Sequence, residues 1–278
     1  MNDGLFNSYM TTPEHPYPRS ILPADWDQPS EGNAALAALF TGSVFHHGDI
    51  HMPYRLFTPG TTESVPLVIF LHGADAIGRD NESQLSLHDI GTMFADPAWQ
   101  KSRPCCILAP QYGPQEHWSD PRIISCTGDL IDDILKNNKR IDPKRLYLYG
   151  YSAGGLGVMS FIRHRPAFYA AAISICGAVS RHGLEQLTGT PLWLFHAADD
   201  RIVKCAYADA SGEPKYYMGS REIYAQLKDV SGCEIRYTEF PEGYMKNTYG
   251  VNPHCSWVCV SGREGVKAKE WMFGKVRT

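Results

Sequence analysis

The sequence lacks the long apolar runs of a membrane-spanning chain. The most apolar stretches, PLVIFL and AAAISICGAV, stop well short of the roughly 20 residues that cross a bilayer as a helix. The basic start and apolar segment of a secretory signal are also missing from the first residues, MNDGLFNSYMTTPEHPYPRS. These absences predict a cytoplasmic protein without a membrane partner, although a secreted chain given without its signal would read the same way.

Charge of one sign is not concentrated anywhere in the chain. The net charge is −4, from 26 basic and 30 acidic residues, and no block of like charge occurs. A protein that binds the phosphates of nucleic acid needs a basic stripe, so nucleic acid is excluded as an expected partner. The 278 residues, 43% hydrophobic and 20% charged, are instead typical of one globular domain with a large core.

Metal-binding motifs are scarce as well. The sequence has neither an HExxH motif nor a pair of CxxC units, so no metal and no cofactor are expected. His46, His47 and His51 lie close together in the sequence. They fall on a predicted hairpin, and we interpret them as a surface cluster, with a metal site as the alternative.

Cysteine, in contrast, is frequent. Because no signal is visible, we expect buried, reduced thiols, with disulfides as the alternative for a secreted protein. Cys255 and Cys259 are the first pair to examine, because they adjoin His254. The eight cysteines are Cys105, Cys106, Cys126, Cys176, Cys205, Cys233, Cys255 and Cys259.

Residues 1–43 are predicted to form an N-terminal extension packed on the outside of a single domain, residues 44–278. The extension is rich in Pro, Asn and Asp until GNAALAALF, a candidate helix. The domain opens with SVFHH and HMPYRLFTP around a Gly-Asp turn, which predicts a hairpin.

Strands and helices then alternate along the chain. The predicted strands are PLVIFLHG, CCILAPQ, RLYLYG, AAAISICGA, PLWLFHA and EIRYTEFP, and the predicted helices are TGDLIDDILKNNK, SAGGLGVMSFIRHRP, SREIYAQLKDV and EGVKAKEWMFGKV. Thr127 is a candidate cap for the first of these helices. The alternation predicts an α/β fold, a three-layer α/β/α sandwich around a mostly parallel, doubly wound sheet. Ligand sites in such folds lie at the carboxyl ends of the strands.

Gly150-Tyr151-Ser152-Ala153-Gly154 fits the pattern GxSxG between a predicted strand and a predicted helix. Glycines two before and two after the serine allow the sharp turn that exposes its hydroxyl, an arrangement typical of α/β hydrolases. We therefore interpret Ser152 as a nucleophile and Tyr151 as a candidate substrate contact.

A serine nucleophile needs a histidine base and a carboxylate, which in this fold follow it in the order acid, then histidine. Four histidines follow residue 152, namely His164, His182, His196 and His254. His254 follows the last predicted strand and is favoured as the base. His164 falls in a helix, His182 is a weaker loop candidate, and His196 precedes the best acid.

The loop after PLWLF contains Asp199 and Asp200, and both fit the position of the acid. Their spacing does not distinguish them, and Asp209 is a weaker candidate. For the oxyanion hole, the backbone N–H groups of Ala153 and of Ala74, after the strand ending in His72-Gly73, are predicted donors.

Several segments together resemble the esterases related to polyhydroxybutyrate depolymerases and to feruloyl and acetyl-xylan esterases, whose members include proteins described only as esterases or peptidases. The likeness runs from about residue 44 to 273. The segments that carry it, in order, are FLHGADAIGRDN, ILAPQY with a following HW, DPKRLYLYGYSAGG, ICGA, FHAADDRIV, SREIYAQLK, IRYTEFP and HCSW.

The resemblance implies Ser152 as nucleophile and His254 as base. It selects Asp200 as the acid, four residues after the histidine of an HGxxDxxV pattern, and implies Ala74 and Ala153 as oxyanion donors. The sequence departs from the family at Ala197 and Pro253, which replace glycines, and in the long aromatic segment 205–219, a candidate wall of the pocket.

The expected function is hydrolysis of a small carboxylic ester, including acetyl or feruloyl esters of plant carbohydrates. A peptidase or amidase on the same scaffold and a non-catalytic binding protein are the alternatives. Trp118 is a candidate substrate contact, with a packing tryptophan as the other interpretation, and His117 and Gln111 are weaker candidates in the same loop. The sequence does not predict the oligomeric state.

Overall fold

The computed structural model describes residues 34–208 and 217–277. Most of the predicted extension, Asp209 and most of the segment 205–219 therefore lie outside the described residues. The candidate helix GNAALAALF contributes α2 (Ala34–Ala37). The strand that opens the sheet already begins at Thr41, so the sheet starts inside the predicted extension of residues 1–43.

Eight strands form one sheet, with the spatial order β1-β2-β4-β3-β5-β6-β8-β10. The β1–β2 hairpin is antiparallel and joins β4 in an antiparallel pair, whereas all other neighbours are parallel. This arrangement confirms the predicted mostly parallel, doubly wound sheet. Its strands are β1 (Thr41–His47), β2 (Ile50–Phe57), β3 (Val65–Leu71), β4 (Cys106–Pro110), β5 (Ile141–Tyr151), β6 (Ala171–Ile175), β8 (Leu192–Ala197) and β10 (Ile235–Phe240).

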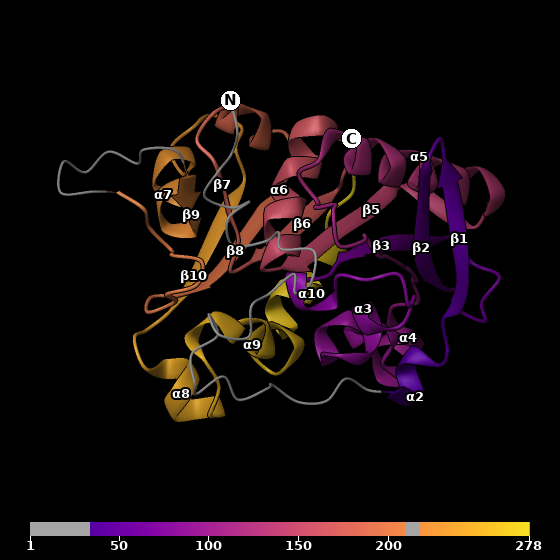
Figure 1. Ribbon diagram of the computed structural model, residues 1–278, viewed down its shortest axis with the longest axis horizontal. Helices are drawn as coiled ribbons and strands as arrows, with labels where there is room; N and C mark the ends of the chain where they lie inside the picture. Colours follow the sequence, from indigo (N-terminus) through magenta and orange to yellow (C-terminus); the bar gives the residue numbers. More distant parts are fainter. Residues whose placement is uncertain (1–33, 209–216, 278) are drawn as a thin grey trace.

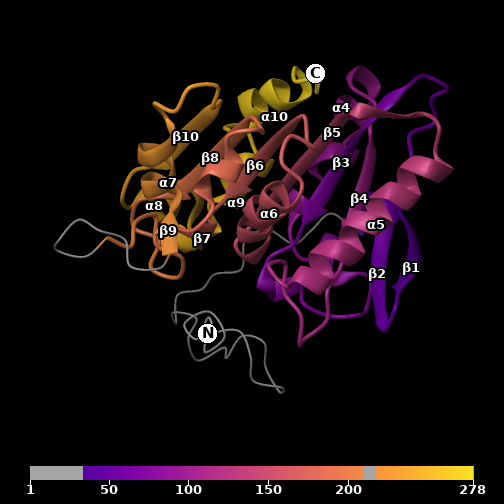
Figure 2. The same ribbon diagram turned by 90° about the horizontal axis from the view of Figure 1, so that it is seen from above.

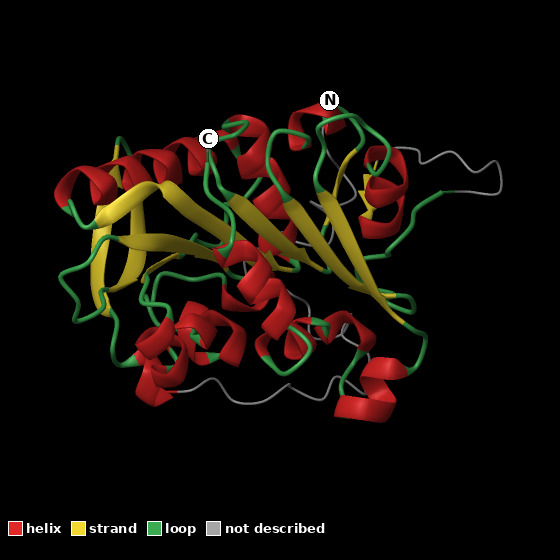
Figure 3. Cartoon of the chain, turned by 180° about the vertical axis from the view of Figure 1, so that it is seen from behind, coloured by secondary structure: helices red, strands yellow, loops and turns green. Residues whose placement is uncertain are grey.

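Helices cover both faces of this sheet, as Figures 1 and 3 show. Seen from above in Figure 2, α5 (Pro121–Asn137) and α6 (Ala153–His164) lie on one side and α10 (Val266–Phe273) on the other. The sheet separates two hydrophobic cores, and alternate residues of β3 belong to one or the other. Leu67, Ile69 and Leu71 lie in one core, and Val68 and Phe70 lie in the other. Strands buried on both faces explain the continuous apolar runs in the sequence.

The predicted start of α5 was wrong. The helix begins at Pro121, and the carboxylate of Asp120 accepts a hydrogen bond of 2.8 Å from the backbone N–H of Arg122. Proline at the first helical position and aspartate before it are standard start signals. Thr127 lies buried within the helix and donates to the carbonyl of Ile123 at 2.8 Å.

Shorter elements complete the described chain. A small antiparallel pair, β7 (Ala178–Ser180) with β9 (Tyr217–Gly219), joins the end of segment 205–219 to the chain that follows β6. The others are η1 (Ala74–Ala76), α3 (Ser83–Ser86), η2 (Asp89–Gly91), η3 (Met93–Ala95), α4 (Pro97–Ser102), η4 (Leu184–Leu187), α7 (Ser220–Leu227), α8 (Tyr244–Tyr249), η5 (Pro253–Cys255) and α9 (Trp257–Ser261). Within the described ranges, no helix has both the length and the apolar character needed to cross a membrane.

The histidines near the hairpin are paired with neighbours at the surface. The Nδ1 atoms of His46 and His51 lie 2.5 Å apart across β1 and β2, and His47 lies 2.9 Å from a carboxylate oxygen of Asp129. Among residues 34–208 and 217–277, no group of three or more His, Cys, Asp or Glu side chains is arranged to hold a metal ion. All eight cysteines are free thiols, and all except the half-buried Cys233 are buried.

Candidate active site

Ser152 occupies a sharp turn between β5 and α6. Its φ of 55° and ψ of −118° fall outside the usual regions for a residue with a side chain. A Cβ atom on Gly154 would lie 1.9 Å from the carbonyl oxygen of Leu71, and one on Gly150 would lie 2.6 Å from the same oxygen. Glycine is therefore required at both positions, as predicted from the GxSxG pattern.

The side chains of Ser152, His254 and Asp200 form one hydrogen-bonded row. The Oγ atom of Ser152 lies 2.9 Å from Nε2 of His254, and Nδ1 of His254 lies 2.7 Å from Oδ2 of Asp200. All three residues are buried, with 5%, 2% and 4% of their surface exposed. The structure thus brings together the three residues that the sequence predicts as nucleophile, base and acid.

The loop that carries His254 is fixed by its own backbone. Pro253 begins the short helix η5, and the side chain of Asn252 accepts a hydrogen bond of 2.9 Å from the N–H of His254. Proline is suited to the first position of a helical turn because its missing N–H would have no partner there. The replacement of the family's glycine by Pro253 is compatible with this turn.

The two adjacent aspartates point in different directions. Asp200 directs Oδ2 to His254, and its Oδ1 accepts hydrogen bonds from the N–H groups of Ile202 at 2.9 Å and Val203 at 3.1 Å. Asp199 instead accepts a hydrogen bond of 2.9 Å from the N–H of Gly243. Only Asp200 reaches the histidine, in agreement with the choice implied by the resemblance.

A second histidine, His196, also contacts the carboxylate of Asp200. Its Nε2 lies 3.2 Å from Oδ2 of Asp200 and 2.7 Å from the carbonyl oxygen of Val203, and its Nδ1 lies 2.8 Å from Oγ of Ser220. Burial would raise the pKa of Asp200, but its electrostatic interaction with His254 and the hydrogen bonds of both histidines hold it well below its usual range. Asp200 is therefore a carboxylate at neutral pH.

The remaining histidine candidates lie elsewhere. His164 ends α6 and His182 follows β7, and both are exposed. Neither belongs to the hydrogen-bonded row. The contact of His196 with Asp200 was not predicted from the sequence, although the HGxxDxxV pattern, which keeps these two residues four apart, contained the signal.

The two predicted oxyanion donors belong to the first residues of two helices. Ala153 is the first residue of α6 and Ala74 is the first residue of η1. First residues of helices have N–H groups without an acceptor in the helix, and these groups favour negative charge. Within the described part of the chain, neither N–H donates to a protein acceptor.

Trp118 and Tyr151 do not line an open cleft. Trp118 is 1% exposed, and its indole N–H donates to the carbonyl of His72 at 2.9 Å. Tyr151 is 2% exposed, and its hydroxyl donates to Oδ1 of Asp75 at 2.7 Å. The prediction of both as substrate contacts is therefore corrected to packing residues behind the loops of the site.

The weaker candidates in the loop that contains Trp118 also have internal partners. Gln111 is fully buried and donates to the carbonyl of Ala76 at 3.1 Å. Nδ1 of His117 lies 2.7 Å from Oγ of Ser119. Gln111 thereby supports the turn η1, which begins with Ala74.

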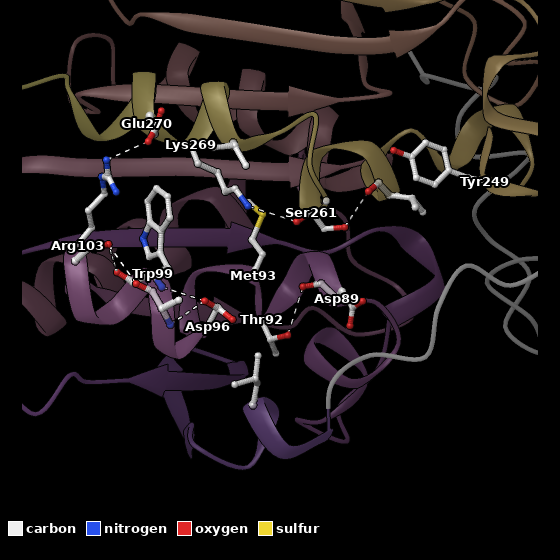
Figure 4. Close-up of a pocket in the computed structure, with 16 residues that line it drawn as sticks. Asp89, Thr92, Met93, Asp96, Trp99, Arg103, Tyr249, Ser261, Lys269 and Glu270 are labelled. Carbon is white, nitrogen blue, oxygen red and sulfur yellow. Dashed lines mark hydrogen bonds and ion pairs between the residues drawn. The ribbon is translucent and has the colours of Figure 1, made fainter.

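A separate pocket of about 660 Å³ lies between α4, α9 and α10 (Figure 4). The buried Lys269 lines it and lies 3.4 Å from the carbonyl of Ser261, and Arg103 pairs with Glu270 across it at 3.1 Å. No member of the row Ser152, His254 and Asp200 lines this pocket, so it is a different surface feature from the candidate active site.

Known proteins with related folds include both esterases and peptidases. The model of the prolyl oligopeptidase family matches residues 129–202, which contain the GxSxG motif and Asp200. The structure of a thermostable esterase is similar with a TM-score of 0.76 and 31% identity, over 87% of this chain and 64% of that one. This chain therefore spans less than two thirds of the esterase's length.

Two further structures share the fold at low identity. An acylaminoacyl peptidase from Pyrococcus horikoshii is 14% identical with a TM-score of 0.61, over 86% of this chain and 42% of that one. Est1E from Butyrivibrio proteoclasticus is 13% identical with a TM-score of 0.56, over 84% of this chain and 98% of that one. No curated protein matches the sequence. The sheet, its helices and these similarities show that the chain has the α/β-hydrolase fold, which these esterases and peptidases share.

Proposed function

We propose that the protein hydrolyses carboxylic esters through an acyl-enzyme on Ser152. The observation that carries the proposal is the buried row in which His254 lies between the Ser152 hydroxyl at 2.9 Å and the Asp200 carboxylate at 2.7 Å. A histidine in this position removes the hydroxyl proton as the serine attacks, because the carboxylate stabilises the positive charge that forms on its ring.

In the first step, Oγ of Ser152 forms a bond to the carbonyl carbon of the ester while Nε2 of His254 takes the hydroxyl proton. The carbonyl oxygen gains the electron pair, and the N–H groups of Ala74 and Ala153 stabilise its charge. When the tetrahedral intermediate collapses, His254 gives the proton to the departing alcohol. Water then repeats the sequence on the acyl-enzyme and releases the carboxylic acid.

We propose small esters as the substrate class, including acetyl or feruloyl esters of plant carbohydrates. Support comes from the ordered sequence segments shared with such esterases and from the 31% identity to a thermostable esterase. Because a fold does not determine its substrate, the acyl and alcohol groups have to be identified by assay.

A peptidase or amidase is the second candidate function. The match of residues 129–202 to the prolyl oligopeptidase family supports it. Parallel assays with p-nitrophenyl esters of acetyl, butyryl and longer acids, with feruloyl esters and with aminoacyl p-nitroanilides separate the two. We expect turnover of short esters; turnover of the anilides alone would reverse the order of the two proposals.

The matched control for every substrate is Ser152→Ala. It should remove turnover while the fold, monitored by circular dichroism, is retained. If the purified wild-type protein turned over none of these substrates and did not react with a fluorophosphonate, the non-catalytic binding protein would be the better description.

A further inference from the structure

A second hydrogen-bonded network joins the loop of Ala74 to the residue immediately before the nucleophile. The hydroxyl of Tyr151 donates to Oδ1 of Asp75 at 2.7 Å, and Nε2 of His88 lies 2.5 Å from Oδ2 of the same carboxylate. Asp75 directly follows Ala74 in η1, and Tyr151 directly precedes Ser152. One carboxylate thus connects the two loops that are proposed to form the oxyanion hole.

The loop also rests directly on the ring of Tyr151. A Cβ atom added to Gly73 would lie 2.3 Å from Cε2 of Tyr151 and 2.7 Å from Oδ1 of Asp75. Only glycine allows this close approach. The backbone that leads into Ala74 is therefore held against the tyrosine ring and its hydroxyl at the same time.

The turn that carries Ala74 has little internal support. It contains one backbone hydrogen bond, from the N–H of Ala76 to the carbonyl of Gly73 at 3.2 Å. Two side chains contact its carbonyls: Nδ1 of His72 lies 2.6 Å from that of Gly73, and Gln111 donates to that of Ala76 at 3.1 Å. Ala153, in contrast, begins the twelve-residue helix α6. The direction of the Ala74 N–H consequently depends on side-chain contacts, among them that of His72 with the preceding carbonyl and those of Asp75, the next residue in the chain.

The carboxylate in this network is charged. Burial would raise the pKa of Asp75, but its hydrogen bond and charge interaction with His88, together with the Tyr151 hydroxyl, lower it. Within the described residues, the other ring nitrogen of His88 is buried without a hydrogen-bond partner, so the ring's polar contact is to Asp75. A charged acceptor makes both bonds stronger than neutral ones and fixes their geometry.

The network continues to the loop of the base through aromatic contacts. The ring of Trp257 lies 4.6 Å from that of Tyr151, 5.2 Å from that of His88 and 5.6 Å from that of His254, between centroids. Tyr151 therefore packs between the oxyanion loop and Trp257, the first residue of α9, which in turn contacts the ring of His254.

We propose that Asp75, held by Tyr151 and His88, is a positioning residue that directs the Ala74 N–H toward the oxyanion. This inference rests on the proposed function. A donor that is aligned for the tetrahedral intermediate stabilises the transition state more than the bound ester, so its misalignment lowers kcat and leaves KM largely unchanged.

The most specific test is Tyr151→Phe, which removes one oxygen atom. Its matched control is Tyr149→Phe, two residues earlier on the same strand face, where the buried hydroxyl donates to the carbonyl of Ile90 at 3.0 Å. We expect Tyr151→Phe to lower kcat for p-nitrophenyl acetate by about tenfold with KM within about twofold. Tyr149→Phe should change stability only.

Substitutions of Asp75 supply the second arm. Asp75→Ala should lower kcat by about 10- to 100-fold, whereas Asp75→Asn, which keeps an acceptor for Tyr151, should recover most of it. Tyr151→Phe combined with Asp75→Ala should be no slower than Asp75→Ala alone, because both remove the same anchor.

An aryl trifluoromethyl ketone adds a readout that a purely structural role would not change. Ser152 Oγ bonds to its carbonyl carbon, His254 takes the proton, and the resulting oxyanion occupies the proposed hole. Its Ki should rise in Tyr151→Phe in proportion to the loss of kcat/KM. Equal kcat in Tyr151→Phe and Tyr149→Phe, or an unchanged Ki with a lowered kcat, would overturn the positioning inference alone. A wild-type protein without ester turnover would instead remove the proposed function.

Discussion

The carboxylate of Asp200 lies 2.7 Å from Nδ1 of His254, although 54 residues separate them in the chain. Asp200 lies in the loop after β8, and His254 lies after β10 and the short helix α8. Because β8 and β10 are parallel neighbours, both loops leave the sheet at its carboxyl edge. The turn after β5 brings Ser152 to the same edge, which is where α/β folds bind ligands.

Asp200→Asn should lower kcat for p-nitrophenyl acetate by roughly 10³- to 10⁴-fold. The amide cannot stabilise the positive charge that forms on His254 during proton transfer. Steady-state kinetics measure the effect, with circular dichroism to verify the fold.

The adjacent Asp199 provides the control for that substitution. Its carboxylate binds the N–H of Gly243 at 2.9 Å and makes no contact with His254. Asp199→Asn should therefore keep kcat within about threefold of the wild type, because it removes no group of the proposed triad. A similar loss of kcat in both variants would contradict the assignment of Asp200 alone.

His72 should make the folded protein sensitive to acid. Burial lowers its pKa from the ordinary value of 6.5 to about 4. Between these two values the unfolded chain binds the proton more tightly than the folded protein, so acidification favours unfolding. The stability that the neutral ring contributes is present above pH 6.5 and is lost as the pH falls toward about 4.

Urea unfolding of the wild type and of His72→Gln at several pH values measures this contribution. The difference between their free energies of unfolding should decrease on acidification by at most about 1.4 kcal/mol per pH unit, which corresponds to one proton. If the free energies of unfolding of the two proteins fell in parallel from pH 7 to pH 4, His72 would not be the cause of the acid sensitivity.

Two glycine substitutions should have opposite effects. Gly154→Ala places a Cβ atom 1.9 Å from the carbonyl oxygen of Leu71, so we expect severe destabilisation and loss of activity. Gly128→Ala in α5 has no neighbour nearer than 3.9 Å and should stabilise the protein by about 0.5–1 kcal/mol through helix propensity. Thermal unfolding followed by circular dichroism compares both with the wild type. Equal stability of the two variants would mean that the close approach at Gly154 is not restrictive.

The sequence was sufficient to predict the sheet and the order of the triad residues. Apolar runs of strand length alternate with helical periodicity, and the order serine, acid, histidine follows from the topology of the fold. It could not distinguish Asp199 from Asp200 by spacing, because the direction of each side chain depends on the turn. That turn is fixed by the N–H groups of Ile202, Val203 and Gly243.

The burial of individual side chains was harder to predict from the sequence than the sheet and the triad. Trp118 follows a strand end, as a residue of a binding cleft does, but it packs against Gly157, where a Cβ atom would lie 2.6 Å from that of the tryptophan. The periodicity of LIDDIL predicts a helix but not its first residue, which is set by the start signal Asp120-Pro121. Asp75 was missed because its partners, Tyr151 and His88, are close only in the folded chain.

The central claim is that Ser152 is the nucleophile of an ester hydrolase. The most direct measurement treats the wild type and Ser152→Ala with a fluorophosphonate, locates the adduct by peptide mass spectrometry and assays p-nitrophenyl acetate hydrolysis on the same samples. We predict one adduct on Ser152 together with complete loss of turnover in the labelled wild type, and neither adduct nor turnover in Ser152→Ala. Two results would contradict the account: a wild type that hydrolyses the ester but forms no adduct with the fluorophosphonate, or a Ser152→Ala protein that retains turnover.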